Sequence, residues 1–277
     1  MKALGWLGVC CLISALLLGG ARPSLAEESR AFLICIPDGP ASTAEVVERL
    51  ETFLKPLGEA LGASVTGEYH TRLAECDRYL ATARPSLVLY PLDLFLKRRK
   101  AQKLSAIGEP VRTGAAKGIS RYHLVASADA TLASVRTGVL MSPHVGNPEF
   151  FTRVVFPGTL DLATFQVKRT SSAMRALKQL KKGKSQAVLL DEAEHVAMGD
   201  LPFAADFKTL LSSETLPHAP IAVMGADAGF RKSAARALVG LCDPGTGAPE
   251  ACEALEIRAI RTVKSKTYRA LIQRWGR

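Results

Sequence analysis

The chain has 277 residues, a formal net charge of +10, and 22% charged and 6% aromatic residues. This length suits one large or two modest domains. Although a basic balance is typical of nucleic-acid binding, the cations are interspersed with acids except at residues 97–100 and 181–184, which lie near expected helix ends. We therefore interpret the charge as a surface property with a mild preference for anionic partners, and exclude nucleic acid as a partner.

The first 26 residues have the pattern of an export signal. Lys2 supplies a positive start, residues 4–18 are apolar, and residues 23–26 end in small side chains before two acids. Because the apolar stretch is short for a membrane span, a cleaved signal peptide is favoured over an uncleaved anchor. We predict a periplasmic mature protein, whose formal charge falls from +10 to +8 because Lys2 and Arg22 are removed with no acid.

Strands and helices then alternate as in right-handed βαβ units, which predicts an α/β fold with mainly parallel sheets. A strand at 31–36 precedes a helix that Ser42 or Thr43 caps, and Pro56 should kink or split this helix. The next elements expected are strands at 64–69, 87–90 and 104–111, and helices at 72–83 and 93–102.

A second α/β series begins near Ser134. We expect its strands at 135–141, 164–168, 186–190 and 207–211, and its helices at 148–156, 172–182 and 192–198. Two crossings, at 119–126 and 219–225, connect the series, and helices at 227–241, 249–255 and 265–274 close the chain. The order predicts two lobes around a cleft: lobe 1 at 27–118, completed by 221–277, and lobe 2 at 119–220. Ligands in such sheets lie beyond the carboxyl ends of the strands.

Four cysteines remain after the signal, and an even number in an oxidising compartment permits two disulfides in three connectivities. Cys242 and Cys252 flank a Gly/Pro-rich loop that a disulfide would hold together, so they are the favoured pair. Cys35 and Cys76 would then form the second. Neither pair has the CxxC spacing of a redox or zinc site.

Several segments together carry a family resemblance. They are 53–69 with its Leu57-Gly58 turn, 80–90, the aromatic-led strand at 122–126, the helix–Gly–strand segment 171–187, the return at 221–224 and the last helix at 268–272. In this order they resemble the periplasmic phosphonate/phosphite-binding proteins, which are receptors of ABC transporters. The resemblance implies the type 2 periplasmic binding protein fold and capture of a small, phosphonate- or phosphate-like anion for an ABC permease.

The chain departs from the family pattern at three places. Ser86 stands where the family usually has Asp, and 183–187 reads GKSQA in place of a Gly-Lys-x-Asp-Ala pattern. The loop at 142–147, SPHVGN, stands at the family's second anion-binding loop, and its Pro143 supplies no N–H.

Candidate ligand-binding residues lie at strand ends, at the start of a crossing strand and in the 142–147 loop. Asn147 suits a helix N-cap and Pro148 the first helical position, and a polar turn that opens a helix can hold an anion. Tyrosines in a cleft can pack on a ligand, although a place at the edge of the core is as good an interpretation. The candidates are Tyr69, Tyr90, Tyr122, Ser142, His144, Gly146 and Asn147.

Geometry limits these candidates. Since successive strand residues point to opposite faces, only one of Tyr69 and His70, and one of Tyr122 and His123, can face the cleft. Asp38 and Asp93 are better interpreted as helix caps than as ligand contacts, because a carboxylate repels an anion.

The sequence has no GxSxG, HExxH or paired-carboxylate motif. Ser142 and His144, two apart in one loop, are poorly arranged as nucleophile and base. Asp191 and His195 have helical i,i+4 spacing, but two ligands without a third do not make a metal site, so helix capping is the better interpretation. We predict a monomeric binding protein without catalytic residues, metal or cofactor. The alternative is an exported module that serves a membrane sensor and binds a ligand other than an oxyanion.

Overall fold

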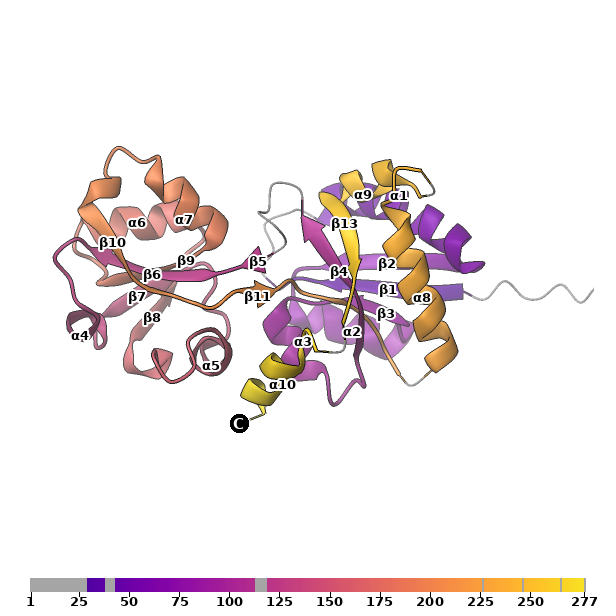
Figure 1. Ribbon diagram of the computed structural model, residues 1–277, viewed down its shortest axis with the longest axis horizontal. Coiled ribbons are helices and arrows are strands. Elements are labelled where there is room, and N and C mark those ends of the chain that lie inside the picture. The colour runs from indigo at the N-terminus through magenta and orange to yellow at the C-terminus, as the bar shows by residue number, and fades with distance from the viewer. Residues whose placement is uncertain are drawn as a thin grey trace, which may run out of the picture.

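The computed structural model describes residues 29–37, 43–112, 119–225, 227–245, 247–264 and 266–276. Figure 1 shows two lobes side by side, each a sheet with helices on both faces. The expected signal peptide, Asp38 and the Gly-rich turn at 113–118 lie outside the described residues. No helix within the described ranges is both long enough and apolar enough to span a membrane.

The first lobe contains a six-stranded sheet in the order β13-β4-β12-β3-β1-β2. β1 pairs in parallel with β2 and β3, whereas β12 runs antiparallel to β3 and β4, and β13 antiparallel to β4. The strands are β1 (Ser29–Cys35), β2 (Ser64–His70), β3 (Leu87–Leu89), β4 (Ser105–Arg112), β12 (Ile221–Val223) and β13 (Ile257–Thr262).

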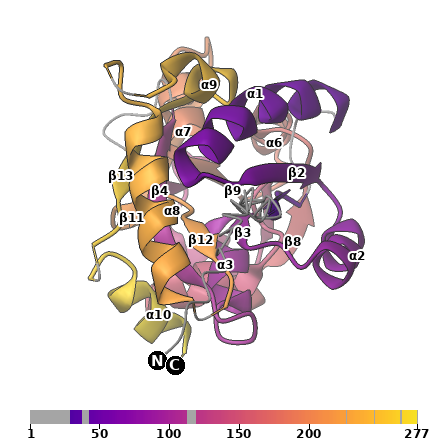
Figure 2. The ribbon, with the colours of Figure 1, turned by 90° about the vertical axis from the view of Figure 1, so that its right-hand side faces the viewer.

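Helices cover both faces of this sheet. α1 (Thr43–Leu61), α8 (Ala228–Leu241) and α9 (Pro249–Ala254) pack together on one face, as Figure 2 shows. Their apolar positions, such as Phe53, Leu57 and Leu238, recur at helical spacing and bury against the strands. α2 (Leu73–Ala83) and α3 (Leu92–Arg98) bury Cys76 and Phe95 in the core of the other face.

The second lobe contains a five-stranded sheet in the order β10-β6-β9-β7-β8. β9, β7 and β8 are parallel, and β6 and β10 complete the sheet in antiparallel pairs. The strands are β6 (Tyr122–Ser127), β7 (Val139–Ser142), β8 (Gln166–Arg169), β9 (Ala187–Asp191) and β10 (Phe207–Ser212).

Figure 1 shows α6 (Ala173–Lys181) and α7 (Glu192–Gly199) above this sheet, and α4 (Leu132–Val135) and α5 (Pro148–Phe150) below it. α5 continues directly into a π-helical turn, η2 (Phe151–Val155). Two short 3₁₀ turns, η3 (Leu162–Thr164) and η4 (Ala204–Asp206), complete the lobe.

Two chain segments connect the lobes. β5 (Ile119–Ser120) leads outward, β11 (Leu216–Pro217) returns, and the two pair antiparallel. Arg121 Nε donates to Thr215 Oγ1 at 3.2 Å, and the Tyr122 N–H donates to Ser213 Oγ at 3.0 Å. We propose this pair as the hinge, with the lobe boundaries between β4 and β5 and just before β12.

The last helix, α10 (Arg269–Trp275), contacts α3 of the first lobe and η2 of the second. Arg153 of η2 donates through Nη1 to the Trp275 carbonyl oxygen at 3.2 Å. Arg274 Nη2 lies 2.8 Å from Glu214 Oε2 in the returning segment. The C-terminal helix therefore contacts both lobes, although in the sequence it comes directly after elements of the first lobe.

Two disulfides stabilise the first lobe. Cys35, at the end of β1, is joined to Cys76 of α2, and Cys242, at the end of α8, is joined to Cys252 of α9. All four side chains are buried. These are the two pairs that the sequence analysis predicted from the Gly/Pro-rich loop between Cys242 and Cys252.

The structure corrects four sequence-based expectations. α1 is not split at Pro56 but continues to Leu61, because its apolar face packs on the sheet along its whole length. The strand expected at 135–141 begins only at Val139, since Thr131 and Ser134 form a capping box that makes 132–135 helical. β13 was not expected. The return crossing is β11, whereas 221–223 is a strand inside the first sheet.

Candidate ligand-binding cleft

A cavity of about 330 Å³ lies between the two lobes. This volume falls at the lower end of the range for small-molecule sites. Both lobes and the returning connection contribute side chains to its wall. The polar and aromatic residues on that wall are Tyr90, Arg112, Tyr122, His144, Phe150, Asp191 and His218.

The parallel strands explain why these residues meet. In the first lobe, Ile36 and Tyr90 directly follow β1 and β3. In the second lobe, His144 lies two residues after β7, and Asp191 is the last residue of β9. The carboxyl ends of both sets of strands therefore face the cavity, which is where open α/β sheets place their ligands.

Tyr90 and Tyr122 line the cavity, as the sequence suggested, while Tyr69 does not. The Tyr90 hydroxyl donates to Gln102 Oε1 at 3.1 Å. Tyr69 is 4% exposed within the core beneath α1, so we do not carry it forward as a ligand contact. The strand alternation places His123 away from the cavity, where it contacts Ser212 and Glu192.

The 142–147 loop forms the helix start that its residues predicted. The Asn147 side-chain oxygen accepts the Phe150 N–H at 3.3 Å, and Pro148 occupies the first position of α5. Ser142 is fully buried, and its Oγ accepts the His144 N–H at 3.0 Å. Gly146 is exposed, and neither it nor Asn147 lines the cavity. His144 is the one residue of this loop on the cavity wall.

The second-lobe wall is acidic. His144 Nε2 lies 2.7 Å from Glu194 Oε2 and 3.8 Å from Asp191 Oδ2. Asp93 of the first lobe adds a third carboxylate on this side of the cavity. Its Oδ2 accepts a hydrogen bond from Nδ2 of Asn147, in the second lobe, at 3.4 Å. The pKa of Tyr122 is raised well above its ordinary value, chiefly because the phenol is buried. The negative charges of Asp191, Asp93 and Glu194 raise it further. The Tyr122 phenol thus stays protonated at any physiological pH.

The opposite wall of the cavity carries Arg112 and His218, which sequence reasoning missed. Arg112 ends β4 with an exposed side chain and forms no ion pair within the described part of the chain. His218 follows β11; its N–H donates to Glu109 Oε1 at 2.8 Å and its carbonyl accepts from the Tyr268 hydroxyl at 2.7 Å. These two bonds fix the backbone, while His218 Nε2 is buried without a hydrogen-bond partner among the described residues.

The environment of His218 affects stability as well as binding. Burial, opposed by Glu109 and assisted by the Arg112 and Arg261 guanidiniums, lowers the pKa of His218 below its ordinary value of 6.5. The unfolded chain therefore takes up this proton first, and stability falls as the pH drops through 6.5. We expect the fall between pH 7.5 and 5.5, measured by urea denaturation, to be smaller in His218→Gln. An unchanged pH dependence would contradict this.

The i,i+4 pair of Asp191 and His195 does not form. Asp191 caps α7 by accepting the Glu194 N–H at 2.8 Å. His195 turns the other way, with Nε2 2.7 Å from Thr209 Oγ1 and its ring stacked on His123 at 3.9 Å. Asp191 thus caps α7 through Oδ1, and its second carboxylate oxygen, Oδ2, faces His144.

This protein is similar to known proteins in its structure but not detectably in its sequence. No protein-family model matches the sequence, and no curated protein is significantly similar to it. The structure is similar to XAC2383 from Xanthomonas citri bound to ATP, with a TM-score of 0.67, 13% identity, and 89% of this chain and 96% of that chain covered.

Two phosphonate-related binding proteins are also similar. One is the binding-protein component of an ABC phosphonate transporter from Pseudomonas aeruginosa (TM-score 0.59, 14% identity, 90% of this chain and 85% of that chain). The other is PhnD1 from Prochlorococcus marinus in complex with methylphosphonate (TM-score 0.58, 11% identity, 88% and 97%). The chain therefore has the two-lobed α/β fold of the type 2 periplasmic binding proteins.

Proposed function

We propose that the chain is an extracytoplasmic solute-binding protein that captures a small anion between its lobes and delivers it to an ABC permease. The observation that carries this proposal is the cavity at the carboxyl ends of strands from both sheets, beside the paired connections β5 and β11. Rotation about such a pair can close two lobes over a ligand. The two disulfides and the expected signal peptide support a periplasmic location.

The anionic group of the solute is best placed against Arg112 and His218. A guanidinium offers a fork of donors that matches phosphonate, phosphate and carboxylate oxygens. His218 Nε2, buried and unpartnered among the described residues, supplies one more donor in the tautomer that protonates it. The 142–147 loop is less suitable, because the Ser142 Oγ is already bound and His144 faces two carboxylates.

Binding of methylphosphonate, phosphate and methanesulfonate to the mature protein, measured by calorimetry, tests this function. A hydrogen bond to a charged group contributes about 1.5–3 kcal/mol, so Arg112→Gln should weaken the anion that binds by about ten- to a hundredfold. Arg121→Gln is the matched control. This substitution removes the same positive charge as Arg112→Gln, and Arg121 lies beside the hinge but does not line the cavity. Equal losses in both variants would show only an effect of net charge and would contradict an anion site at Arg112.

One observation favours the second candidate function, an exported module whose ligand is not an oxyanion and whose partner is a membrane sensor. Asp93, Asp191 and Glu194 surround the Tyr122 side of the cavity, and carboxylates disfavour an anion there. Stabilisation of the protein by small amines, together with no response to any of the three anions, would select this function over the first.

We propose no catalytic activity. The Ser142 hydroxyl contacts the backbone of its own loop rather than the imidazole of His144, and His144 contacts carboxylates. A nucleophile and its base would have to hydrogen-bond to each other.

A further inference from the structure

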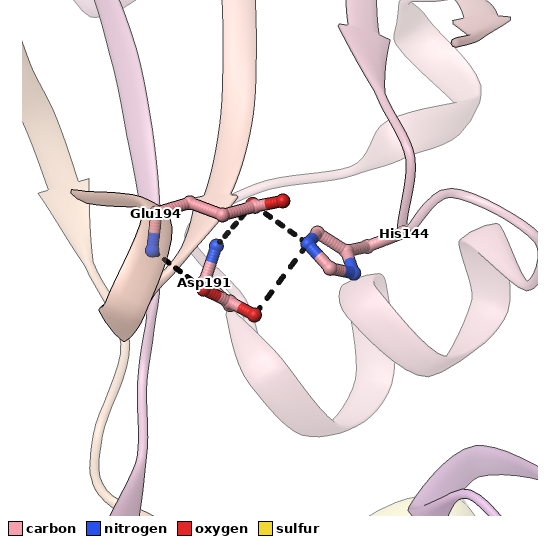
Figure 3. A group of neighbouring side chains, drawn as sticks. All are labelled: His144, Asp191 and Glu194. Atoms are coloured by element: carbon pink, nitrogen blue, oxygen red, sulfur yellow. Dashed lines mark hydrogen bonds and ion pairs between the residues drawn. The ribbon is translucent and has the colours of Figure 1, made fainter. Parts of the chain in front are cut away.

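Three side chains on the second-lobe wall converge on one point. His144 comes from the loop after β7, Asp191 ends β9, and Glu194 lies in the first turn of α7. Figure 3 shows the imidazole directed at both carboxylates. One ligand atom from each residue, the His144 ring nitrogen and two carboxylate oxygens, lies within 4.8 Å of the others. The three side chains are 24–33% exposed, so they are neither in the core nor fully solvated.

The carboxylates are held in place before any ligand arrives. Asp191 Oδ1 accepts the Glu194 N–H at 2.8 Å, and Glu194 Oε2 accepts the Asp191 N–H at 3.1 Å. This reciprocal capping box leaves Asp191 Oδ2 directed at His144. On the other side, the His144 ring packs against the edge of Tyr122 at 5.7 Å between centroids. Fixed rotamers lower the entropic cost of binding a ligand.

The charge of the cluster is not balanced by protein. Within the described part of the chain, His144 is the partner of both Asp191 and Glu194, and no Lys or Arg pairs with either. Even a protonated imidazole would leave one negative charge in excess, and Asp93 adds another nearby through Asn147. A divalent cation would compensate these charges.

We propose that His144, Asp191 and Glu194 form a binding site for a first-row divalent transition metal, with Zn²⁺ as its best-fitting member. One imidazole and two carboxylates suit zinc, whereas Mg²⁺ and Ca²⁺ prefer oxygen ligands alone. With metal–ligand bonds of about 2.0–2.2 Å, tetrahedral ligand atoms lie about 3.3 Å apart. The separations of 2.7 and 3.8 Å at His144 bracket that value, so small side-chain shifts admit the ion.

The metal would keep an open coordination position on the cavity. His144 and Asp191 both line the cavity wall, so a fourth ligand would come from water or from the captured solute. This inference goes beyond the proposed function and does not depend on it, because metal binding is measured without any solute.

Calorimetry of the chelator-treated mature protein with ZnCl₂ tests the site, with MgCl₂, CaCl₂ and ethanolamine as further titrants. We expect one zinc ion per chain and at least tenfold weaker binding of Mg²⁺ and Ca²⁺. Glu194→Gln and His144→Ala should each weaken zinc binding at least tenfold. Far-UV circular dichroism checks that the variants fold; His144→Ala changes a loop side chain and leaves the capping box intact.

Glu192→Gln is the matched control, since Glu192 lies on the same helical turn but pairs with His123. It should bind zinc like the unchanged protein. Absence of zinc binding, zinc binding unaltered by Glu194→Gln and His144→Ala, or a loss in Glu192→Gln alone would each overturn the proposal. Binding of ethanolamine without zinc would also overturn it, and would assign the cluster to an organic amine. Anion binding that depends on Arg112 is a separate readout, so each proposal can fail alone.

Discussion

Replacing Cys35 and Cys76 by alanine is expected to lower the free energy of unfolding by about 4 kcal/mol. The disulfide joins residues 41 positions apart, and closure of a loop of that length removes much of the conformational entropy of the unfolded chain. Both side chains are fully buried, so alanine, not serine, is the substitution that adds no polar atom to the core. Urea denaturation under oxidising conditions measures the change.

The second disulfide is the matched control for this prediction. Cys242 and Cys252 are 10 positions apart, and the same entropy relation gives about 3 kcal/mol for the alanine pair. The larger loss should therefore follow removal of Cys35–Cys76. The opposite order would show that local packing, rather than loop closure, dominates at these sites. Because Ile36 follows Cys35 and lines the cavity, we also expect the first variant to bind its ligand less tightly.

Phe151→Ala is expected to cost about 3–5 kcal/mol of stability, the range for removing a buried aromatic ring. Phe151 is 2% exposed in the π-helical turn η2. Its ring contacts that of Tyr122 edge-on at 5.0 Å, so it supports one wall of the cavity. The variant should lose ligand affinity as well as stability, which calorimetry and urea denaturation measure separately.

Phe203→Ala provides the comparison for Phe151. Phe203 is half-buried at the edge of the second lobe, against Phe207 and Lys181, and does not line the cavity. We expect its loss of stability to be smaller, about 1 kcal/mol, as for a typical point mutant, and its ligand affinity to be unchanged. Equal effects of the two substitutions would mean that the contact with Tyr122 does not support the site.

Local signals in the sequence predicted most of the architecture. The Asn147-Pro148 pair predicted the start of α5, and the alternation of strands and helices predicted the two α/β series. β13 was missed because Arg258 and Arg261 interrupt its apolar positions, so an edge strand looks like a polar connection. β11 is two residues long and forms only because β5 lies beside it.

The site was harder to predict, because its residues are distant in sequence. His144 and Glu194 are 50 positions apart, and no local pattern joins them. One signal was present: β7 and β9 are parallel neighbours, so the residues that follow them meet at one sheet edge. Arg112 and His218 meet only because the chain leaves and re-enters the first lobe side by side. Of Tyr69 and His70, the sequence could not tell which faces the cleft; the Tyr69 side chain is buried in the core beneath α1.

The position of α10 restricts how the molecule can open. A hinge made only of β5 and β11 would leave each lobe free to rotate as a separate body. The Trp275 carbonyl, however, accepts a hydrogen bond from Arg153 of η2 in the second lobe, and α10 also packs near α3 in the first (Figure 1). Widening of the cleft on this side must either break that bond or carry the helix along with one lobe. A fluorescent donor on α10 and an acceptor on each lobe in turn would thus report which lobe the C-terminus follows.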